Sequence, residues 1–248
     1  MLYHIEAISD RGRVRANNED HILVGGEVFT DDHRNWNSAF DLGSRVFAVA
    51  DGMGGHNAGE IASKMVLQSL HGCLANLNPA VALQEFEDTL VLWLESIHQE
   101  MEKAGNEDPG LRGMGTTLTG LFFGDNKIFC FHAGDSRAYR YHNKNLQLLT
   151  NDHTLNNNPG MPERRSNMLL NCISAINHPR LDIAEIDHFR GSTYLLCSDG
   201  LTDMVPEMKL AELIGSSDAK SLVDEASKNG GRDNITLIYI KPPFNFKT

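Results

Sequence analysis

Four aspartates stand where short apolar segments meet loops. Asp51 ends RVFAVAD, Asp135 follows FCFHAG, Asp199 follows YLLCS, and Asp233 precedes NITLIYI. One such acid is ordinary turn chemistry, but packed sheets can bring several strand ends into one cleft, where carboxylates repel one another unless protonated or neutralised. Hard divalent cations such as Mg²⁺ and Mn²⁺ neutralise them, because these ions bind carboxylates, carbonyls and water. The pattern therefore predicts a metal site, and carboxylates shared between ions would make it a two-metal centre that activates water against a phosphoryl group.

Two neighbouring segments fit such a site. In DGMGGHNAGE, which begins at Asp51, the glycines allow backbone carbonyls to come close to an ion. The segment RVRANNED places Arg15 near Glu19 and Asp20. An arginine fork suits bidentate binding of a phosphate, but this short run alone favours a solvated cluster of surface charges.

The elements that must position these residues follow from hydrophobic periodicity. Apolar residues at three- and four-residue spacing predict two long helices, over 58–77 and from Pro79 onward, with Asn78 as the cap of the second. Shorter helices are expected over 206–214 and 218–228. Short strands separated by turn residues are expected over 3–9, 45–51, 116–123, 127–134, 138–142, 146–150, 192–200 and 234–240. The segment 25–40 is interpreted as a hairpin with an exposed loop. The pattern is typical of an α+β fold with layered antiparallel sheets.

Length, charge and cysteine content indicate how many domains to expect and which kinds of partner and location to exclude. The chain has 248 residues without repeats or an evident linker, so we expect a single domain over 1–248. Its 33 Asp and Glu against 22 Lys and Arg give a formal charge of -11, which argues against a nucleic-acid partner. No membrane insertion is expected, since no apolar run approaches a membrane span and no signal peptide is apparent. The four scattered cysteines favour buried thiols in a reducing, cytoplasmic location over disulfides or a zinc site.

Seven motifs follow one another from Arg15 to Ile238: RANNED, FAVADGMGGHNAGE, GMGTTLTG, HAGDSRAYR, LTNDHT, CSDGLTD and GGRDNITLI. In these motifs and their order the chain resembles the metal-dependent protein phosphatases, the type 2C serine/threonine phosphatase family, and DGMGGH is typical of its bacterial members. This resemblance implies a four-layer sandwich of two packed antiparallel sheets flanked by helices on both outer faces.

The resemblance also implies a binuclear Mn²⁺ or Mg²⁺ centre. Asp51 would bridge two ions and the carbonyl of Gly52 would bind one of them. Asp199 and Asp233 would complete the first ion's site, and Glu19 would support the second, largely through waters. This centre would activate water for the hydrolysis of phosphoserine and phosphothreonine.

The remaining implied roles concern a third ion and the substrate. Asp135 and Asp199 look like ligands of a labile third ion, with Asp203 a weaker candidate nearby. Arg15 would hold the substrate phosphate, Asn234 would contact a water of the centre, and His56 would be the general acid. For His56 the other interpretation is a residue that caps the following helix.

The partners expected are phosphorylated Ser/Thr proteins, those of a cognate kinase among them, and a monomer is expected. The segment 151–180, the flap of the family, departs from the usual pattern with three consecutive asparagines, which leaves the substrate open. Two alternatives remain. One is a catalytically silent pseudophosphatase of this fold, although the expected ligands are all present. The other is an ATP-binding protein, but a Walker loop is absent, and a histidine-kinase-type pocket would leave three of the aspartates unexplained.

Overall fold

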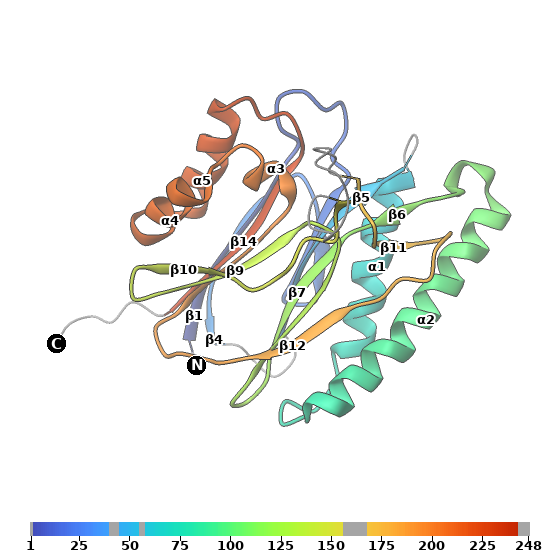
Figure 1. The fold of residues 1–248 in the computed structure, drawn as a ribbon, viewed down its shortest axis with the longest axis horizontal. Helices are drawn as coiled ribbons and strands as arrows, with labels where there is room; N and C mark the ends of the chain where they lie inside the picture. Colours follow the sequence, from blue (N-terminus) through green and yellow to red (C-terminus); the bar gives the residue numbers. More distant parts are fainter. Residues whose placement is uncertain (1, 40–44, 55–57, 156–167, 243–248) are drawn as a thin grey trace.

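Two antiparallel sheets packed face to face form the centre of the molecule (Figure 1). The computed structural model describes residues 2–39, 45–54, 58–155 and 168–242. The first sheet has six strands in the order β10-β9-β13-β14-β1-β4. Their bounds are β1 Leu2–Asp10, β4 His33–Ala39, β9 Arg137–His142, β10 Asn145–Leu148, β13 Thr193–Cys197 and β14 Ile235–Lys241.

The second sheet has eight strands. It runs β11-β6-β5-β7-β8-β12, and β2 pairs with both β3 and β5. Its bounds are β2 Asp20–Val24, β3 Glu27–Phe29, β5 Val46–Met53, β6 Gly115–Thr116, β7 Leu118–Phe123, β8 Ile128–Ala133, β11 Ile173–Ser174 and β12 Asp182–Ile186. In β5 the first five side chains are all buried, which is why this strand reads as a continuous apolar run rather than an alternating one.

Helices cover the outer face of each sheet. The helices α1 (Ala58–Leu74) and α2 (Leu83–Glu107) pack side by side on the second sheet, and a short 3-10 turn, η1 (Pro109–Leu111), follows α2. The helices α3 (Asp199–Thr202), α4 (Glu207–Ser216) and α5 (Ala219–Lys228) cover the first sheet (Figure 1). The molecule thus has four layers, and the expected α+β sandwich is confirmed.

Each of the three interfaces between layers is apolar. Between the sheets, Phe47 and Leu121 of the second sheet meet Tyr194 and Ile238 of the first. Under the long helices, Phe86 stacks on Phe129 with ring centroids 4.6 Å apart. Burial of the inner faces fixes which way each strand-end residue points, because a shift of one residue in register would turn every side chain to the opposite face.

Two local expectations are corrected. The second long helix begins at Leu83 rather than Pro79. Residues 78–81 form a turn in which the Asn78 carbonyl accepts from the amide of Val81, and the Pro79 carbonyl accepts from the amide of Asp125, so this segment is committed to a tertiary contact. The segment 25–40 is not one hairpin, because β3 returns along β2 in the second sheet whereas β4 joins β1 in the first.

The described helices include none long and apolar enough to cross a membrane. The four cysteines are free. Cys130 and Cys197 are buried, as expected, whereas Cys73 and Cys172 are only half-buried.

Candidate active site

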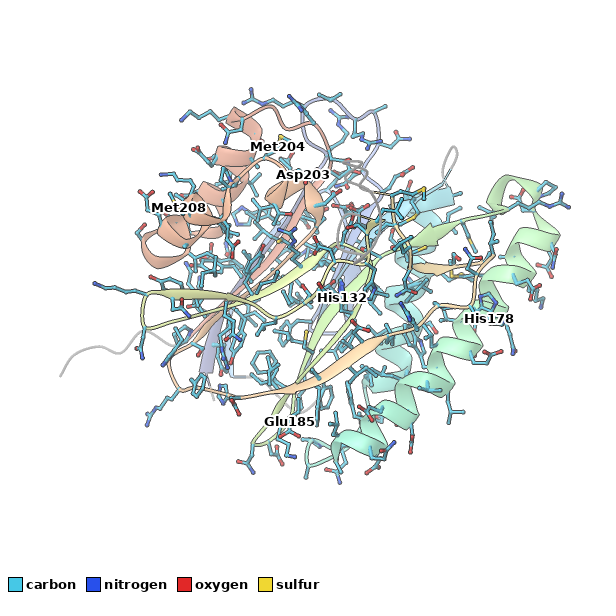
Figure 2. The ribbon with its side chains drawn as sticks, viewed as in Figure 1. His132, His178, Glu185, Asp203, Met204 and Met208 are labelled. Atoms are coloured by element: carbon cyan, nitrogen blue, oxygen red, sulfur yellow. The ribbon has the colours of Figure 1, made fainter. Side chains whose placement is uncertain are left out.

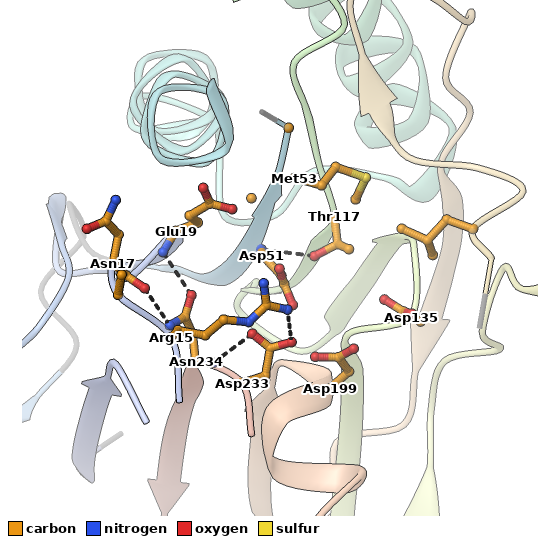
Figure 3. A pocket seen from close by; sticks show the side chains of 14 residues that line it. Arg15, Asn17, Glu19, Asp51, Met53, Thr117, Asp135, Asp199, Asp233 and Asn234 are labelled. Carbon is orange, nitrogen blue, oxygen red and sulfur yellow. Dashed lines mark hydrogen bonds and ion pairs between the residues drawn. The ribbon is translucent and has the colours of Figure 1, made fainter. Parts of the chain in front are cut away.

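One pocket of about 510 Å³ brings together nearly all of the residues singled out from the sequence (Figure 3). Its lining includes Arg15, Glu19, Asp51, Gly52, Asp135, Asp199, Asp233 and Asn234. These residues come from β5, from the turns after β8 and before β14, and from the loop before β2, while Asp199 begins α3 because the strand expected over 192–200 ends at Cys197. The pocket confirms the geometric expectation that strand ends of the two packed sheets converge.

Two further sequence candidates are His56 and Asp203. His56 lies outside the described residues. Asp203 directly follows α3 (Figure 2). Its amide donates to the carbonyl of Asp199 at 2.8 Å, and it is not among the described lining residues of the pocket.

Asp51 is held by the register of β5 against two neighbours. It pairs with Asp20 of β2. Its amide donates to Oγ1 of Thr117 at 3.0 Å, and its carbonyl accepts from the amide of Thr117 at 2.9 Å. Gly52 comes next, and a Cβ there would lie 2.1 Å from the carbonyl oxygen of Gly59 and 2.6 Å from that of Glu19. Only glycine therefore allows β5 to approach α1 and the Glu19 backbone this closely.

Asn234 fastens the loop that carries Arg15 and Glu19. Its Oδ1 accepts from the amide of Glu19, and its Nδ2 donates to the carbonyls of Arg11 and Asn17, each at 2.9 Å. The side chain is 5% exposed. A buried amide that satisfies three backbone groups at once holds the N-terminal loop against the start of β14.

Arg15 is directed at a carboxylate. Its Nη2 donates to Oδ2 of Asp233 at 2.6 Å, and the other oxygen of Asp233 accepts from the amide of Asn234 at 2.9 Å. The side chain is 54% exposed, and it lines the pocket beside the acids (Figure 3). Of the two sequence-based interpretations of Arg15, the structure therefore favours a role in the site.

The carboxylates of the pocket disturb one another. Burial raises the pKa of Asp51 well above its ordinary value, and Asp20, Asp199 and Asp135 add to the shift. Burial, then Asp233, raises the pKa of Asp199 to about 6, and burial, then Asp199, raises that of Asp135 to about 7. Oδ1 of Asp199 is buried without a hydrogen-bond partner. Repelling carboxylates with an unsatisfied oxygen favour a bound cation.

The set of donors fits hard divalent ions, since it consists of carboxylates and a backbone carbonyl with no thiol or imidazole among the described lining residues. Within the described ranges, no three His, Cys, Asp or Glu side chains converge closely enough to identify a metal site by spacing alone. A metal site is supported by the oxygen donors and by the mutual repulsion of the aspartates, and not by a complete set of ligands already in place.

Two residues at or beside the pocket had received no role from the sequence. Asp20 is 1% exposed and accepts from Oγ of Ser198 at 2.8 Å, and burial raises its pKa to about 7. The sequence feature that could have identified Asp20 is its position directly after Glu19, at the start of the apolar strand β2. Thr117, which links the backbone of Asp51 to Ser136, lay within the GMGTTLTG motif but had received no role.

Comparison with known proteins decides the family. The sequence profile of protein phosphatase 2C matches residues 21–230. The chain belongs to the protein phosphatase 2C family. The expected resemblance is confirmed over nearly the whole chain.

Curated relatives and solved structures agree with this assignment. The serine/threonine phosphatase stp of Listeria monocytogenes is 31% identical over 96% of this chain and 95% of its own length. The serine/threonine protein phosphatase PstP of Mycobacterium tuberculosis is 32% identical over 96% of this chain and 45% of its own length. A crystal structure of PstP superposes with a TM-score of 0.81 at 30% identity, covering 98% of this chain and all of that one.

A second PstP structure bears on the metals. It is the catalytic domain in complex with two manganese ions, with a TM-score of 0.76 at 30% identity over 97% of this chain and 98% of that one. These relatives support the phosphatase interpretation and not the pseudophosphatase alternative.

Proposed function

We propose that this member of the protein phosphatase 2C family is a metal-dependent serine/threonine protein phosphatase. The observation that carries the proposal is the single pocket in which strand-end aspartates of both sheets meet Glu19 and an arginine. The names of the relatives, all serine/threonine or protein phosphatases, support the substrate class.

The proposed metal ligands are among the residues that line the pocket. Asp51 would bridge two ions, and the carbonyl of Gly52 would bind one of them. Asp199 and Asp233 would complete the first ion's site, and Glu19 would support the second, largely through waters. Mn²⁺ or Mg²⁺ is the cofactor that these donors prefer, and the two manganese ions of the PstP structure support the choice. Asp135 and Asp199 would hold a third, labile ion. Bound ions of this kind supply an activated water and neutralise the charge of the phosphoryl group.

The other side chains act on the substrate or on the loops. Arg15 exchanges its contact with Asp233 for the phosphate oxygens of the substrate and stabilises their charge in the transition state. Asn234 keeps Arg15 and Glu19 at the pocket, and its expected contact with a water of the centre stays a prediction. His56 is the proposed acid that protonates the departing serine or threonine oxygen.

The wider setting is likewise a proposal. The chain would act as one catalytic domain over 1–248, as a monomer, in bacterial signalling opposite a cognate Ser/Thr kinase. The four free cysteines support a reducing compartment such as the cytoplasm. The acidic charge of -11 supports protein rather than nucleic-acid substrates.

The test is hydrolysis of p-nitrophenyl phosphate and of phosphothreonine peptides with Mn²⁺, Mg²⁺, Ca²⁺ or EDTA. Turnover with Mn²⁺ or Mg²⁺ that EDTA abolishes is the expected result. Calorimetry with ATP addresses the nucleotide-binding alternative in the same preparation, since tight binding of ATP without hydrolysis of phosphopeptides would contradict the proposal.

A further inference from the structure

Asp135 reaches the pocket from a short turn after β8, and the residues on both sides of it are fastened. On one side, Oγ of Ser136 is 2.8 Å from Oγ1 of Thr117, and the Ser136 carbonyl accepts from Oγ1 of Thr119 at 2.9 Å. On the other side, Gly134 adopts φ +120, and a Cβ there would lie 2.6 Å from the side chain of Thr117. The backbone around Asp135 therefore has little freedom of its own, and what holds Gly134 helps to decide where the carboxylate points.

His153 holds Gly134 through both of its backbone groups. The amide of Gly134 donates to Nδ1 of His153 at 3.2 Å, and the amide of His153 donates to the Gly134 carbonyl at 2.7 Å. The imidazole is 9% exposed and lies beside the ring of His132, with centroids 4.8 Å apart. The His153 ring thus contacts the residue directly before Asp135 without itself lining the pocket.

The hydrogen bonds of His153 determine its tautomer. Nδ2 of Asn171 also points at Nδ1, at 2.8 Å. The orientation of that amide is set by Arg180, whose carbonyl accepts from Nδ2 and whose amide donates to Oδ1. Two N–H donors at Nδ1 require a lone pair there, so the ring proton sits on Nε2 and is donated to Oδ2 of Asp182 at 3.0 Å.

The same imidazole joins three parts of the chain. His153 belongs to the LTNDHT motif, Asn171 belongs to the segment that leads to β11, and Asp182 begins β12. A further bond, from the amide of Leu170 to the His153 carbonyl at 2.8 Å, ties the second of these segments to the first. The described ends of the divergent flap segment thus meet at the residue that holds the Asp135 turn.

We propose that His153 is a positioning residue that aims the Asp135 carboxylate by accepting the Gly134 N–H at Nδ1, and that it thereby couples the flap segment to the cation at Asp135. The inference rests on the proposed function, in which Asp135 binds the third ion. Partners outside the first coordination sphere orient metal ligands, and their loss typically weakens metal binding roughly 10–100-fold.

A matched pair of substitutions tests whether the His153 side chain acts as the hydrogen-bond acceptor of Gly134 or only fills space. In His153→Asn the side-chain oxygen can take the place of Nδ1, whereas in His153→Gln the amide lies nearer the place of Nε2 and leaves Gly134 without its acceptor. Bound Mn²⁺ is counted by titration of the full chain with electron paramagnetic resonance. His153→Gln should weaken the loosest class of Mn²⁺ roughly 10–100-fold and leave the two tighter ions unchanged, whereas His153→Asn should stay near wild type.

Asn171→Asp provides a second route to the same state should His153→Gln fail to fold. A carboxylate at Asn171 would hold a proton on Nδ1 and remove the acceptor from Gly134. Because Nε2 still donates to Asp182, the ring would then be an imidazolium whose positive charge offsets that of the new carboxylate. Weaker binding of the third ion in this variant therefore supports positioning, and unchanged or tighter binding overturns it. Unchanged binding in His153→Gln, or equal losses in His153→Gln and His153→Asn, also overturns it.

Asp135→Asn tests whether Asp135 binds the third ion, separately from whether His153 positions Asp135. The loosest Mn²⁺ class should disappear in this variant. If that class persists, the assignment of the third ion to Asp135 is wrong. If it disappears in Asp135→Asn but stays intact in His153→Gln, the assignment holds and the role of His153 is wrong.

Discussion

Arg15 and Asp233 are 218 residues apart in the chain, yet Nη2 of Arg15 lies 2.6 Å from Oδ2 of Asp233 inside the pocket. The guanidinium, which is shaped to hold a phosphate, is thus paired with a carboxylate assigned to the first ion. Both side chains are partly exposed, at 54% and 35%, so the pair contributes roughly 0–1 kcal/mol and is easily exchanged. Phosphate binding by Arg15 therefore requires little rearrangement.

Arg15→Ala should damage substrate recognition and spare metal binding. Loss of a charged hydrogen bond of about 1.5–3 kcal/mol corresponds to a fall in kcat/KM of roughly 10–150-fold for a phosphopeptide. The fall in kcat/KM should come chiefly from a higher KM, and kcat should also fall if the contact tightens in the transition state. The substitution removes a positive neighbour from Asp233. The affinity for Mn²⁺, measured by calorimetry, should therefore stay the same or increase. An unchanged kcat/KM would make Arg15 a surface charge.

Removal of the divalent ion should abolish activity. The donors gathered in the pocket are carboxylates and a carbonyl, which hold Mn²⁺ or Mg²⁺ rather than substrate, and the sequence lacks the Cys-x5-Arg loop of cysteine phosphatases. Dialysis against EDTA followed by assay with p-nitrophenyl phosphate measures the effect, and readdition of Mn²⁺ or Mg²⁺ should restore the rate. Full turnover after chelation would exclude the proposed centre.

Asp51→Asn, Asp199→Asn and Asp233→Asn should each remove nearly all activity while the protein still folds. Each substitution takes a negative charge from a site that needs several, so the loss should exceed the roughly 10–100-fold typical of residues outside the first coordination sphere. Assays at saturating Mn²⁺ test this, with Asp88→Asn, at an exposed position of α2 outside the pocket lining, as a matched control. A wild-type rate in any of the first three variants would mean that the site is elsewhere.

The same carboxylates should make the chelated protein less stable at higher pH. The pKa of Asp199 is raised to about 6 and that of Asp135 to about 7, against about 3.9 for an unperturbed Asp. Between pH about 4 and about 7 these two carboxyl groups therefore hold more protons in the folded state than in the unfolded state, and their contribution to the free energy of unfolding falls as pH rises through this window. Thermal melts in EDTA at pH 5 and pH 8 should show this fall, and Asp199→Asn should flatten it. A change in melting temperature between the two pH values that is the same in Asp199→Asn as in the wild type would contradict the raised pKa of Asp199.

The role of His56 can be tested through the leaving group. A serine or threonine oxygen needs a proton to depart, whereas p-nitrophenolate leaves without one. If His56 is the general acid, His56→Ala should slow phosphopeptide hydrolysis by roughly 10²–10⁴-fold and p-nitrophenyl phosphate hydrolysis far less. Comparison of kcat for the two substrates decides the matter, and equal losses would return His56 to a structural role.

The sequence by itself determined the chemistry and the layers. Asp51, Asp135, Asp199 and Asp233 each follow or precede an apolar run, and this local pattern was enough to predict strand ends, acidic ligands and divalent ions. The order of the motifs was enough for the family, which the profile over residues 21–230 confirms. These features are local, because a strand end and its adjoining acid lie within a few residues of each other.

Tertiary structure decided which groups meet, because strand pairing and sheet packing join residues that are far apart in the chain. Asp20 becomes an acid of the site only by pairing with Asp51 across β2 and β5, and His153 reaches Gly134 only because the chain returns after β10. A long-range contact also overrode the local signal at Pro79, whose carbonyl accepts from the amide of Asp125. The raised pKa values have the same origin, since burial between the packed sheets takes the carboxylates out of water and sets them against one another.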